Sequence, residues 1–222
     1  MHIADNVARV QERILQACER ARRDPTTVTL VTITKGMPAA QIEAAHRAGA
    51  HHLGENRVQE AQVKLPLLAH LSPSPVWHLV GHLQTNKVKP ALSLFSTFHS
   101  VDSVRLARAL SQRAKSPLPI FLEVNMAGEH TKYGFTPDEV TSTLTEIKEL
   151  PHLDVRGLMM VAPMAADPQS LRPLFQRLRK LADSLGLREL SMGMTDDFEV
   201  AVEEGSTLVR IGRAIFGERR PA

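Results

Sequence analysis

The chain has 222 residues, of which 43% are hydrophobic and 23% are charged. This length and mixture predict one globular domain spanning residues 1–222 and exclude a disordered or fibrous protein. The formal net charge of +3 comes from 27 basic and 24 acidic residues spread along the sequence, so we expect no concentrated patch for nucleic acid or a membrane.

The sequence indicates a reducing compartment. Cys18 is the only cysteine, so it cannot form an intramolecular disulfide, and no cysteine cluster offers a zinc site. We expect Cys18 to be a core residue of a helix. The first residues lack the basic and apolar stretches of a signal peptide, and no apolar run approaches the length of a membrane span. These features predict a cytoplasmic protein.

The first predicted element is a helix over residues 2–22. Its apolar residues recur at helical spacing among Arg, Gln and Glu, and Asp24-Pro25 ends the pattern.

After this helix, strand-like runs alternate with helix-like runs. The predicted strands are residues 28–34, 51–53, 76–80, 97–100, 120–124, 155–159, 189–191 and 208–211. The predicted helices are residues 39–48, 57–70, 85–92, 104–115, 138–150, 169–185 and 198–203, with a short helix after the last strand. Eight such repeats, with strands apolar on both faces, predict an α/β protein. A single (β/α)8 TIM barrel with an extra N-terminal helix fits better than an open doubly wound sheet.

Three loop-rich stretches interrupt this alternation. Residues 72–75 and 116–119 come just before strands, so they are expected on the far rim of the barrel. Residues 162–168 follow a strand and could therefore cover the active mouth.

Polar residues collect where the predicted strands end. Catalytic groups of a barrel gather at these C-terminal ends, so the candidates are expected to share one rim. They are Lys35, Glu55, Asn56, Arg57, His78, His82, His99, Asp102, Glu123, Asn125, Thr195 and Arg210.

Lys35 ends the first strongly hydrophobic strand. Its β-branched neighbours would partly desolvate the amine, which lowers an amine's pKa and makes it a better nucleophile toward an aldehyde. A lysine at a strand end is more often a solvated rim residue, so the rest of the rim has to decide its role. The chain closes with a strand that runs into a glycine-punctuated turn, residues 208–217, which could hold a phosphate on the same rim. Together with this turn, such a lysine indicates pyridoxal 5'-phosphate.

Two glycine-containing turns follow the last two strands, at residues 191–195 and 211–213. Barrels often bind phosphate there with backbone amides, and Gly193 and Gly212 would let the backbone approach a ligand closely. The plainer interpretations are a helix N-cap at Asp196 and a tight turn at Gly212.

Arg210 lies on the last strand. An always-charged guanidinium there could donate a hydrogen bond to a pyridine nitrogen but could not fully protonate it. An ordinary ion pair with Glu203 or Glu204 is the alternative.

Two other motifs carry weaker signals. His78 and His82 have a spacing that would suit a metal only on a helix, and the first lies on a strand, so no metal site is expected. Tyr133 is the only tyrosine, and it could serve as a second acid or base if it is not simply a packed or solvent-facing loop residue.

Seven segments together resemble the pyridoxal phosphate homeostasis protein family, small barrel proteins similar to the cofactor domain of bacterial alanine racemase. In chain order they are residues 34–35, 54–60, 77–87, 132–134, 156–159, 192–197 and 205–217. The resemblance implies that Lys35 forms a Schiff base with pyridoxal phosphate and that Arg210 faces the pyridine nitrogen. The other cofactor-binding residues that it implies are Asn56, Met194, Thr195, Gly212 and Arg213.

Two positions depart from the family pattern. Thr195 stands where the family usually has Ser and keeps the hydroxyl. Arg213 stands where the family often has Thr or Ser, so only its backbone amide is expected to contribute.

The resemblance implies a protein that binds pyridoxal phosphate reversibly and takes part in its intracellular homeostasis, without an established turnover reaction. Its expected partners are the cofactor, amino acids and, transiently, enzymes that use the cofactor. A monomer is expected, because a closed barrel has no open sheet edges. An amino-acid racemase using the same cofactor and a class I aldolase using Lys35 alone remain the alternatives. Racemisation is handicapped, because two-base chemistry needs groups on opposite faces of the substrate and Lys35 supplies only one.

Overall fold

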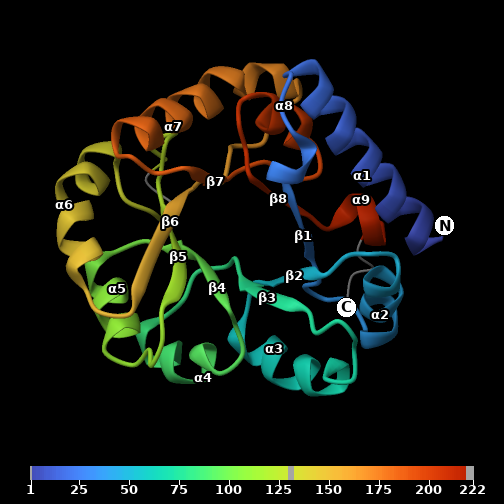
Figure 1. Ribbon diagram of the computed structural model, residues 1–222, viewed down its shortest axis with the longest axis horizontal. Coiled ribbons are helices and arrows are strands. Elements are labelled where there is room, and N and C mark those ends of the chain that lie inside the picture. Colours follow the sequence, from blue (N-terminus) through green and yellow to red (C-terminus); the bar gives the residue numbers. More distant parts are fainter. Residues whose placement is uncertain (1, 130–132, 219–222) are drawn as a thin grey trace.

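The computed structural model describes residues 2–129 and 133–218. Eight parallel strands close into one barrel in chain order, which confirms the predicted (β/α)8 architecture (Figure 1). The strands are β1 Thr29–Ile33, β2 His52–Glu55, β3 Val76–Leu79, β4 Thr97–Val101, β5 Leu118–Glu123, β6 Leu153–Met159, β7 Glu189–Ser191 and β8 Leu208–Ile211. Ring closure comes from β1 and β8, which pair in parallel with Thr29 beside Leu208.

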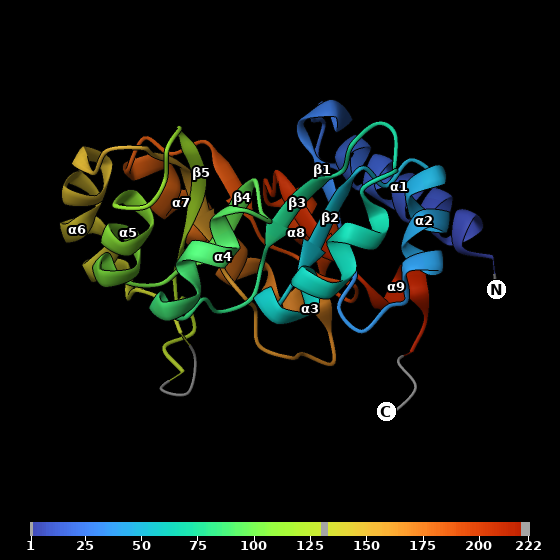
Figure 2. The ribbon, with the colours of Figure 1, turned by 90° about the horizontal axis from the view of Figure 1, so that it is seen from below.

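A ring of helices surrounds the strands (Figure 1), and Figure 2 shows the same arrangement turned by 90°. The helices are α1 Ile3–Arg20, α2 Ala39–Arg47, α3 Val58–Lys64, α4 Val88–Leu92, α5 Val104–Ser111, α6 Pro137–Glu149, α7 Arg172–Ser184, α8 Phe198–Glu203 and α9 Arg213–Phe216. None of the helices in the described part of the chain is both long and apolar enough to cross a membrane.

The structure refines several predicted boundaries. The predicted helix over 57–70 is α3 followed by a 3-10 helix, Leu65–Leu68, because Pro66 has no amide to continue the α-helical ladder. Single 3-10 turns also precede α4 and α7. The predicted loop at 116–119 is two residues too long, since β5 already begins at Leu118.

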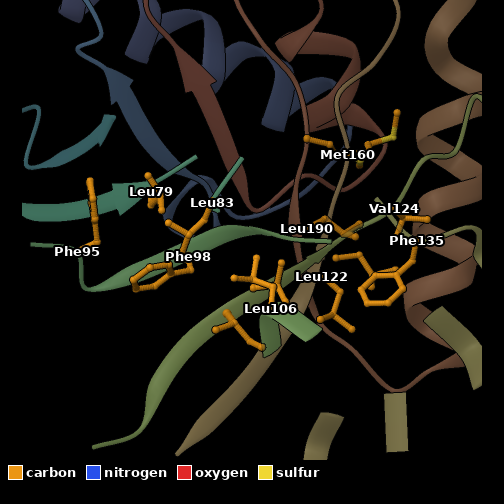
Figure 3. Packing of buried hydrophobic residues seen from close by; sticks show 14 of the residues in the cluster. Leu79, Leu83, Phe95, Phe98, Leu106, Leu122, Val124, Phe135, Met160 and Leu190 are labelled. Carbon is orange, nitrogen blue, oxygen red and sulfur yellow. The ribbon is translucent and has the colours of Figure 1, made fainter. Parts of the chain in front are cut away.

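The main hydrophobic core lies between the strands and the outer helices. Figure 3 shows part of it, with Phe98 and Leu122 from the strands packed near Leu106 of α5 and Phe135. A second core cluster joins α1 to α8, α9 and β8, and Cys18 is fully buried within it, as predicted. The extra helix therefore completes the outer layer.

The interior of the barrel is partly polar. Its apolar part consists of Val31, Phe121, Met159 and Leu208, with Ile33 packed against them. His78 and His99 are buried within β3 and β4 and contact each other. The expectation that both histidines lie on the C-terminal rim is therefore wrong, because each is placed within its strand and not at its end.

Candidate functional site

Lys35 lies in the turn that follows β1 and is partly buried. The backbone on both sides of it is held by side chains from β2 and α3. The Lys64 ammonium donates to the Thr34 carbonyl at 2.8 Å, and the Thr34 hydroxyl donates to Glu55 at 2.6 Å. On the other side, the amide of Gly36 donates to Glu60. The peptide that carries Lys35 is thus fixed from two directions.

Lys64, Glu55 and Glu60 form a charged group that we call the lysine clamp. The buried ammonium of Lys64 lies 2.6 Å from Glu55 Oε1 and 2.7 Å from Glu60 Oε1. Glu55 Oε2 has no hydrogen-bond partner among the described residues. Burial raises the pKa of Glu55, although Lys64 and Thr34 oppose the shift by hydrogen bonding. The lysine clamp therefore pairs one buried cation with two carboxylates, of which Glu55 is buried and Glu60 is partly exposed.

Sequence reasoning did not identify Lys64 or Glu60. Their i, i+4 spacing on one helix face was a usable signal for an ion pair, and Glu55 had been placed on the rim. What the spacing did not reveal is that Lys64 also reaches the backbone of Thr34, which lies 30 residues earlier.

Arg210 is buried within β8, one residue before the strand ends, and oxygens of Ser191 and Met160 hold its guanidinium. One terminal nitrogen donates to the Ser191 carbonyl at 2.7 Å and to the Ser191 hydroxyl at 2.5 Å, while the other donates to the Met160 carbonyl at 2.7 Å. Burial lowers the pKa of Arg210 to about 10, against the opposing charges of Glu123 and Asp197. The group is still a cation and a hydrogen-bond donor near neutral pH.

The predicted alternative partners of Arg210 are wrong. Glu203 and Glu204 instead form ion pairs with Arg172 on α7, and Glu203 also pairs with Arg20 on α1. These contacts lie on the outer layer of helices, whereas Arg210 points into the barrel. Among the described residues, all the hydrogen bonds of its guanidinium come from the two terminal nitrogens, so Nε is not engaged.

The two glycine-containing turns lie side by side. The amide of Arg210 donates to the Gly193 carbonyl at 3.0 Å, and an ion pair joins Arg213 to Asp196. Thr195, which is partly buried, therefore belongs to a loop next to the Gly212–Arg213 turn. The first turn of α9 begins there, and amides in a first helical turn lack intrahelical acceptors.

Asp196 is not the N-cap of α8. Asp197 takes that position, and its side chain accepts from the Met194 amide instead of capping the helix.

Close packing is a further reason for glycine at both positions 193 and 212. Gly193 has φ +94 and a Cβ there would lie 2.6 Å from that of Ala201, while a Cβ at Gly212 would lie 3.2 Å from the Ile33 carbonyl.

Asn56 directly follows β2 and is partly buried. Gly81, in the loop after β3, packs so closely on it that a Cβ would lie 2.3 Å from the Asn56 carbonyl oxygen. The loop of Lys35 is joined to the same strand, because the Thr34 amide donates to the Gly54 carbonyl at 2.9 Å. Asn56 and Lys35 thus follow neighbouring strands of one rim.

A second group of titratable residues follows β3, β4 and β5. His82 lies 2.7 Å from Asp102, and its ring stacks on Tyr133 with a centroid separation of 3.8 Å. Burial, followed by the charge of Asp102, raises the pKa of Glu123 to about 7. Tyr133 is 58% exposed, so it is a solvent-facing loop residue. Glu123 was named as a rim residue, but its perturbed acidity had no sequence signal.

His78 and His82 do not share a ligand position. His78 contacts two other histidines inside the barrel, whereas His82 contacts Asp102 and Tyr133. Across residues 2–129 and 133–218, no three His, Cys, Asp or Glu side chains gather closely enough to hold a metal ion.

The whole chain matches known sequences. The family model of the alanine racemase N-terminal domain matches residues 3–220. A pyridoxal phosphate homeostasis protein of Pseudomonas aeruginosa is 43% identical, over 98% of this chain and 96% of the relative. This chain belongs to the pyridoxal phosphate homeostasis protein family. Another member, from Aquifex aeolicus, is 41% identical over 99% of this chain and its own full length.

Solved structures of family relatives share the barrel. PipY of Synechococcus elongatus, solved with pyridoxal phosphate bound, is 36% identical with a TM-score of 0.84 and covers 97% of this chain and 100% of PipY. A protein of Bifidobacterium adolescentis reaches a TM-score of 0.90 at 38% identity, over 97% of this chain and 94% of its own. An alanine racemase of Clostridium difficile, at 12% identity, has a TM-score of 0.71 over 95% of this chain and 60% of its own and shares the fold alone.

Proposed function

We propose that this protein binds pyridoxal 5'-phosphate reversibly as a Schiff base of Lys35 and takes part in its intracellular homeostasis. The observation that carries the proposal is the position of Lys35, on a turn clamped by Lys64 and Glu60 at one end of a barrel that also buries Arg210. The names of the family relatives and the cofactor bound to PipY support it.

The residues present fit the three chemical parts of this cofactor. The Lys35 amine suits its aldehyde. The Thr195 hydroxyl, with the Met194 loop and the amides of the Gly212–Arg213 turn, suits a phosphate dianion. The unengaged Nε of Arg210 would suit the pyridine nitrogen, and Asn56 follows β2, the strand next to that of Lys35.

Arg210 determines how strongly the protein activates the bound ring. When bound, pyridoxal phosphate supplies an aldehyde for amines and a ring that withdraws electrons from them. A guanidinium whose pKa is about 10 remains charged and offers a hydrogen bond without giving up its proton. Arg210 would therefore hold the ring nitrogen by a hydrogen bond while leaving the ring a weak electron sink. Such a site favours holding the cofactor over catalysing reactions with it.

The wider assignments belong to the same proposal. The partners are the cofactor, amino acids that can displace Lys35 from it and, transiently, enzymes that receive it. A single domain that acts as a monomer agrees with a barrel closed by β1 and β8. A cytoplasmic location rests on the composition, with Cys18 the only cysteine.

An amino-acid racemase is the second candidate, because Glu123, at the C-terminal end of β5, is an acid with a pKa of about 7. Chiral chromatography of L-alanine incubated with the loaded protein tests it. We expect D-alanine to form no faster than with the cofactor alone. Turnover that disappears in both Glu123→Gln and Tyr133→Phe would make the racemase the better assignment.

Borohydride reduction of the protein incubated with pyridoxal phosphate, followed by peptide mass mapping, tests the proposed function. We expect the pyridoxyl label on Lys35, and we expect Lys35→Ala to lose the yellow absorbance while remaining folded, because this side chain lies outside the core. Lys89→Ala, which removes an exposed lysine, is the matched control and should label normally. Label recovered mainly on Lys87 or Lys132 would overturn the assignment; Lys132 lies outside the described residues.

A further inference from the structure

A continuous chain of hydrogen bonds crosses the interior of the barrel and ends on Arg210. His52 Nδ1 lies 3.0 Å from His78 Nε2, and His78 Nδ1 lies 2.9 Å from His99 Nε2. His99 Nδ1 lies 2.7 Å from the hydroxyl of Ser191, which accepts from Arg210. We call these three histidines and Ser191 the histidine chain. Its members come from β2, β3, β4 and β7, so the fold assembles it from four strands.

The histidine chain lies in surroundings that favour neutral imidazoles. His99 is fully buried and stacks on Phe121 with a centroid separation of 4.7 Å. Burial lowers the pKa of His78 to about 3 and that of His99 well below its usual value, and the Arg210 cation lowers the pKa of His99 further. Burial also lowers the pKa of the half-buried His52. Each ring therefore carries one proton near neutral pH and has one donor and one acceptor nitrogen.

Arg210 determines which nitrogen of each ring carries that proton. A guanidinium only donates, so the Ser191 hydroxyl accepts from it. Among the described residues, the one remaining hydrogen-bond partner of this hydroxyl is His99 Nδ1, which we therefore infer accepts the hydroxyl proton. The proton of His99 is then on Nε2, which donates to His78 Nδ1, and His78 Nε2 in turn donates to His52 Nδ1. Every hydrogen bond of the histidine chain therefore has the same polarity, with the donor on the side of Arg210.

His52, the member of the histidine chain farthest along it from Arg210, lies at the face of the barrel opposite the rim that carries Lys35. A cavity of about 470 Å³ lies there, and its lining includes His52, His78 and Phe121. Thr29 and Leu208, the first residues of β1 and β8, also line it. His52 Nε2 therefore has its proton at the end of the chain next to a region that water can reach. The chain satisfies every buried ring nitrogen without adding a second charge beside Arg210.

We propose that His99 is a positioning residue, which fixes the Ser191 hydroxyl as an acceptor and thereby holds the Arg210 guanidinium with Nε directed to the pyridine nitrogen. The consequence for the cofactor rests on the proposed function, whereas the polarity of the histidine chain does not. Without an acceptor at position 99, the Ser191 hydroxyl can rotate, and one anchor of the guanidinium is lost. The remaining anchors are carbonyls of Ser191 and Met160.

The first experiment uses the protein without cofactor. Two-bond ¹⁵N–¹H correlation spectra of ¹⁵N-histidine-labelled protein at pH 7.5 report which ring nitrogen is protonated. We expect His52, His78 and His99 all to carry the proton on Nε2. Single His→Gln variants assign the signals. A His99 ring protonated on Nδ1, or on both nitrogens, would overturn the proposal whatever the protein binds.

The second experiment compares variants at position 99. His99→Gln keeps one acceptor and one donor, whereas His99→Leu keeps neither. His46→Leu is the control, because His46 is also buried and hydrogen-bonded but contacts Pro73 and His51, away from Arg210. A folded state is confirmed for each variant by its unfolding transition.

The measurement is the affinity for pyridoxal phosphate relative to its analogue with carbon in place of the ring nitrogen. We expect the wild type to prefer the natural cofactor by about tenfold, the value of one well-placed hydrogen bond. His99→Leu should reduce this preference to about threefold or less, while His99→Gln and His46→Leu keep most of it. An unchanged preference in His99→Leu would refute the positioning role. Failure of the wild type to bind either compound would instead refute the proposed function, and the spectra would still decide the polarity.

Discussion

The two buried polar networks of this barrel hold their site residues in different ways. The lysine clamp fixes the backbone around Lys35 with a buried cation and two carboxylates. The histidine chain reaches Arg210 through neutral groups that each donate once and accept once. One network depends on opposite charges at close range, and the other depends on protons being on the correct nitrogens.

The difference predicts how each network fails. Removing the Lys64 cation from the lysine clamp leaves the buried Glu55 carboxylate without its partner, which is among the most costly changes in a protein. Removing one ring from the histidine chain leaves unpaired but neutral donors and acceptors, which costs less. Acid should disrupt the histidine chain, because protonating a buried imidazole breaks its directional hydrogen bonds.

The largest expected effect comes from breaking the lysine clamp. Lys64→Met should lower the free energy of unfolding by about 3–5 kcal/mol, because Glu55 stays buried without its cation. Adding Glu55→Gln should recover part of this loss, since the remaining group is then neutral. Urea unfolding at pH 7.5 measures both variants. A loss below about 1 kcal/mol in Lys64→Met, or no recovery in the double variant, would show that the clamp is not a buried ion network.

The contribution of the histidine chain to stability should depend on pH in the acid range. The pKa of His78 is about 3 in the folded protein and near 6.5 when unfolded, so its stabilising contribution is complete above pH 6.5 and is lost as the pH falls toward 3. His78→Gln replaces the imidazole by a group that does not titrate in this range. Between pH 6.5 and 4.5, the wild type should therefore lose about 1.4 kcal/mol per pH unit more than the variant. Urea unfolding across this range measures the difference, and parallel curves would contradict the assignment of a neutral buried ring.

Glu123 sharpens the comparison, because it is a largely buried carboxyl that belongs to neither network. Its pKa of about 7 exceeds the usual 4.5, so the stability given by its protonated form is complete below pH 4.5 and is lost as the pH rises through 7. Glu123→Gln mimics the protonated form. The variant should be more stable than the wild type by about 1–2 kcal/mol at pH 8, allowing for its partial exposure, and equal to it at pH 4.5. A variant that is less stable at pH 8 would show a favourable partner for the carboxylate.

An exposed ion pair should contribute least to the free energy of unfolding. Arg108 and Glu146 approach to 2.7 Å on the outer helices, with side chains 60% and 44% exposed. Glu146→Gln should change the free energy of unfolding by no more than about 0.5 kcal/mol, because water and salt screen such pairs. The same urea measurement applies. An effect as large as that of Lys64→Met would remove the distinction between buried and exposed charges on which the comparison rests.

The sequence by itself determined the repeat pattern and the chain positions of the main candidates. The alternation of short apolar runs with helical runs is a local property, since side-chain direction repeats every two residues in strands and every 3.6 in helices. That pattern placed Lys35 after β1 and Arg210 on β8, and the structure agrees with both positions. Boundaries shifted where proline ended an α-helical ladder, as at Pro66.

Only the tertiary structure decided which of these side chains meet. The contacts of the histidine chain join residues separated by 26, 21 and 92 positions, and their pairing depends on the register of β2, β3 and β4 and on the closing of the barrel. A sequence pattern records which way a side chain points along its own strand, but not which side chain faces it from another. The rim placement of His78 and His99 was wrong because both residues lie within their strands. The partners of Arg210 and Lys64 became visible only when distant strands and helices packed around them, because those partners come from other elements.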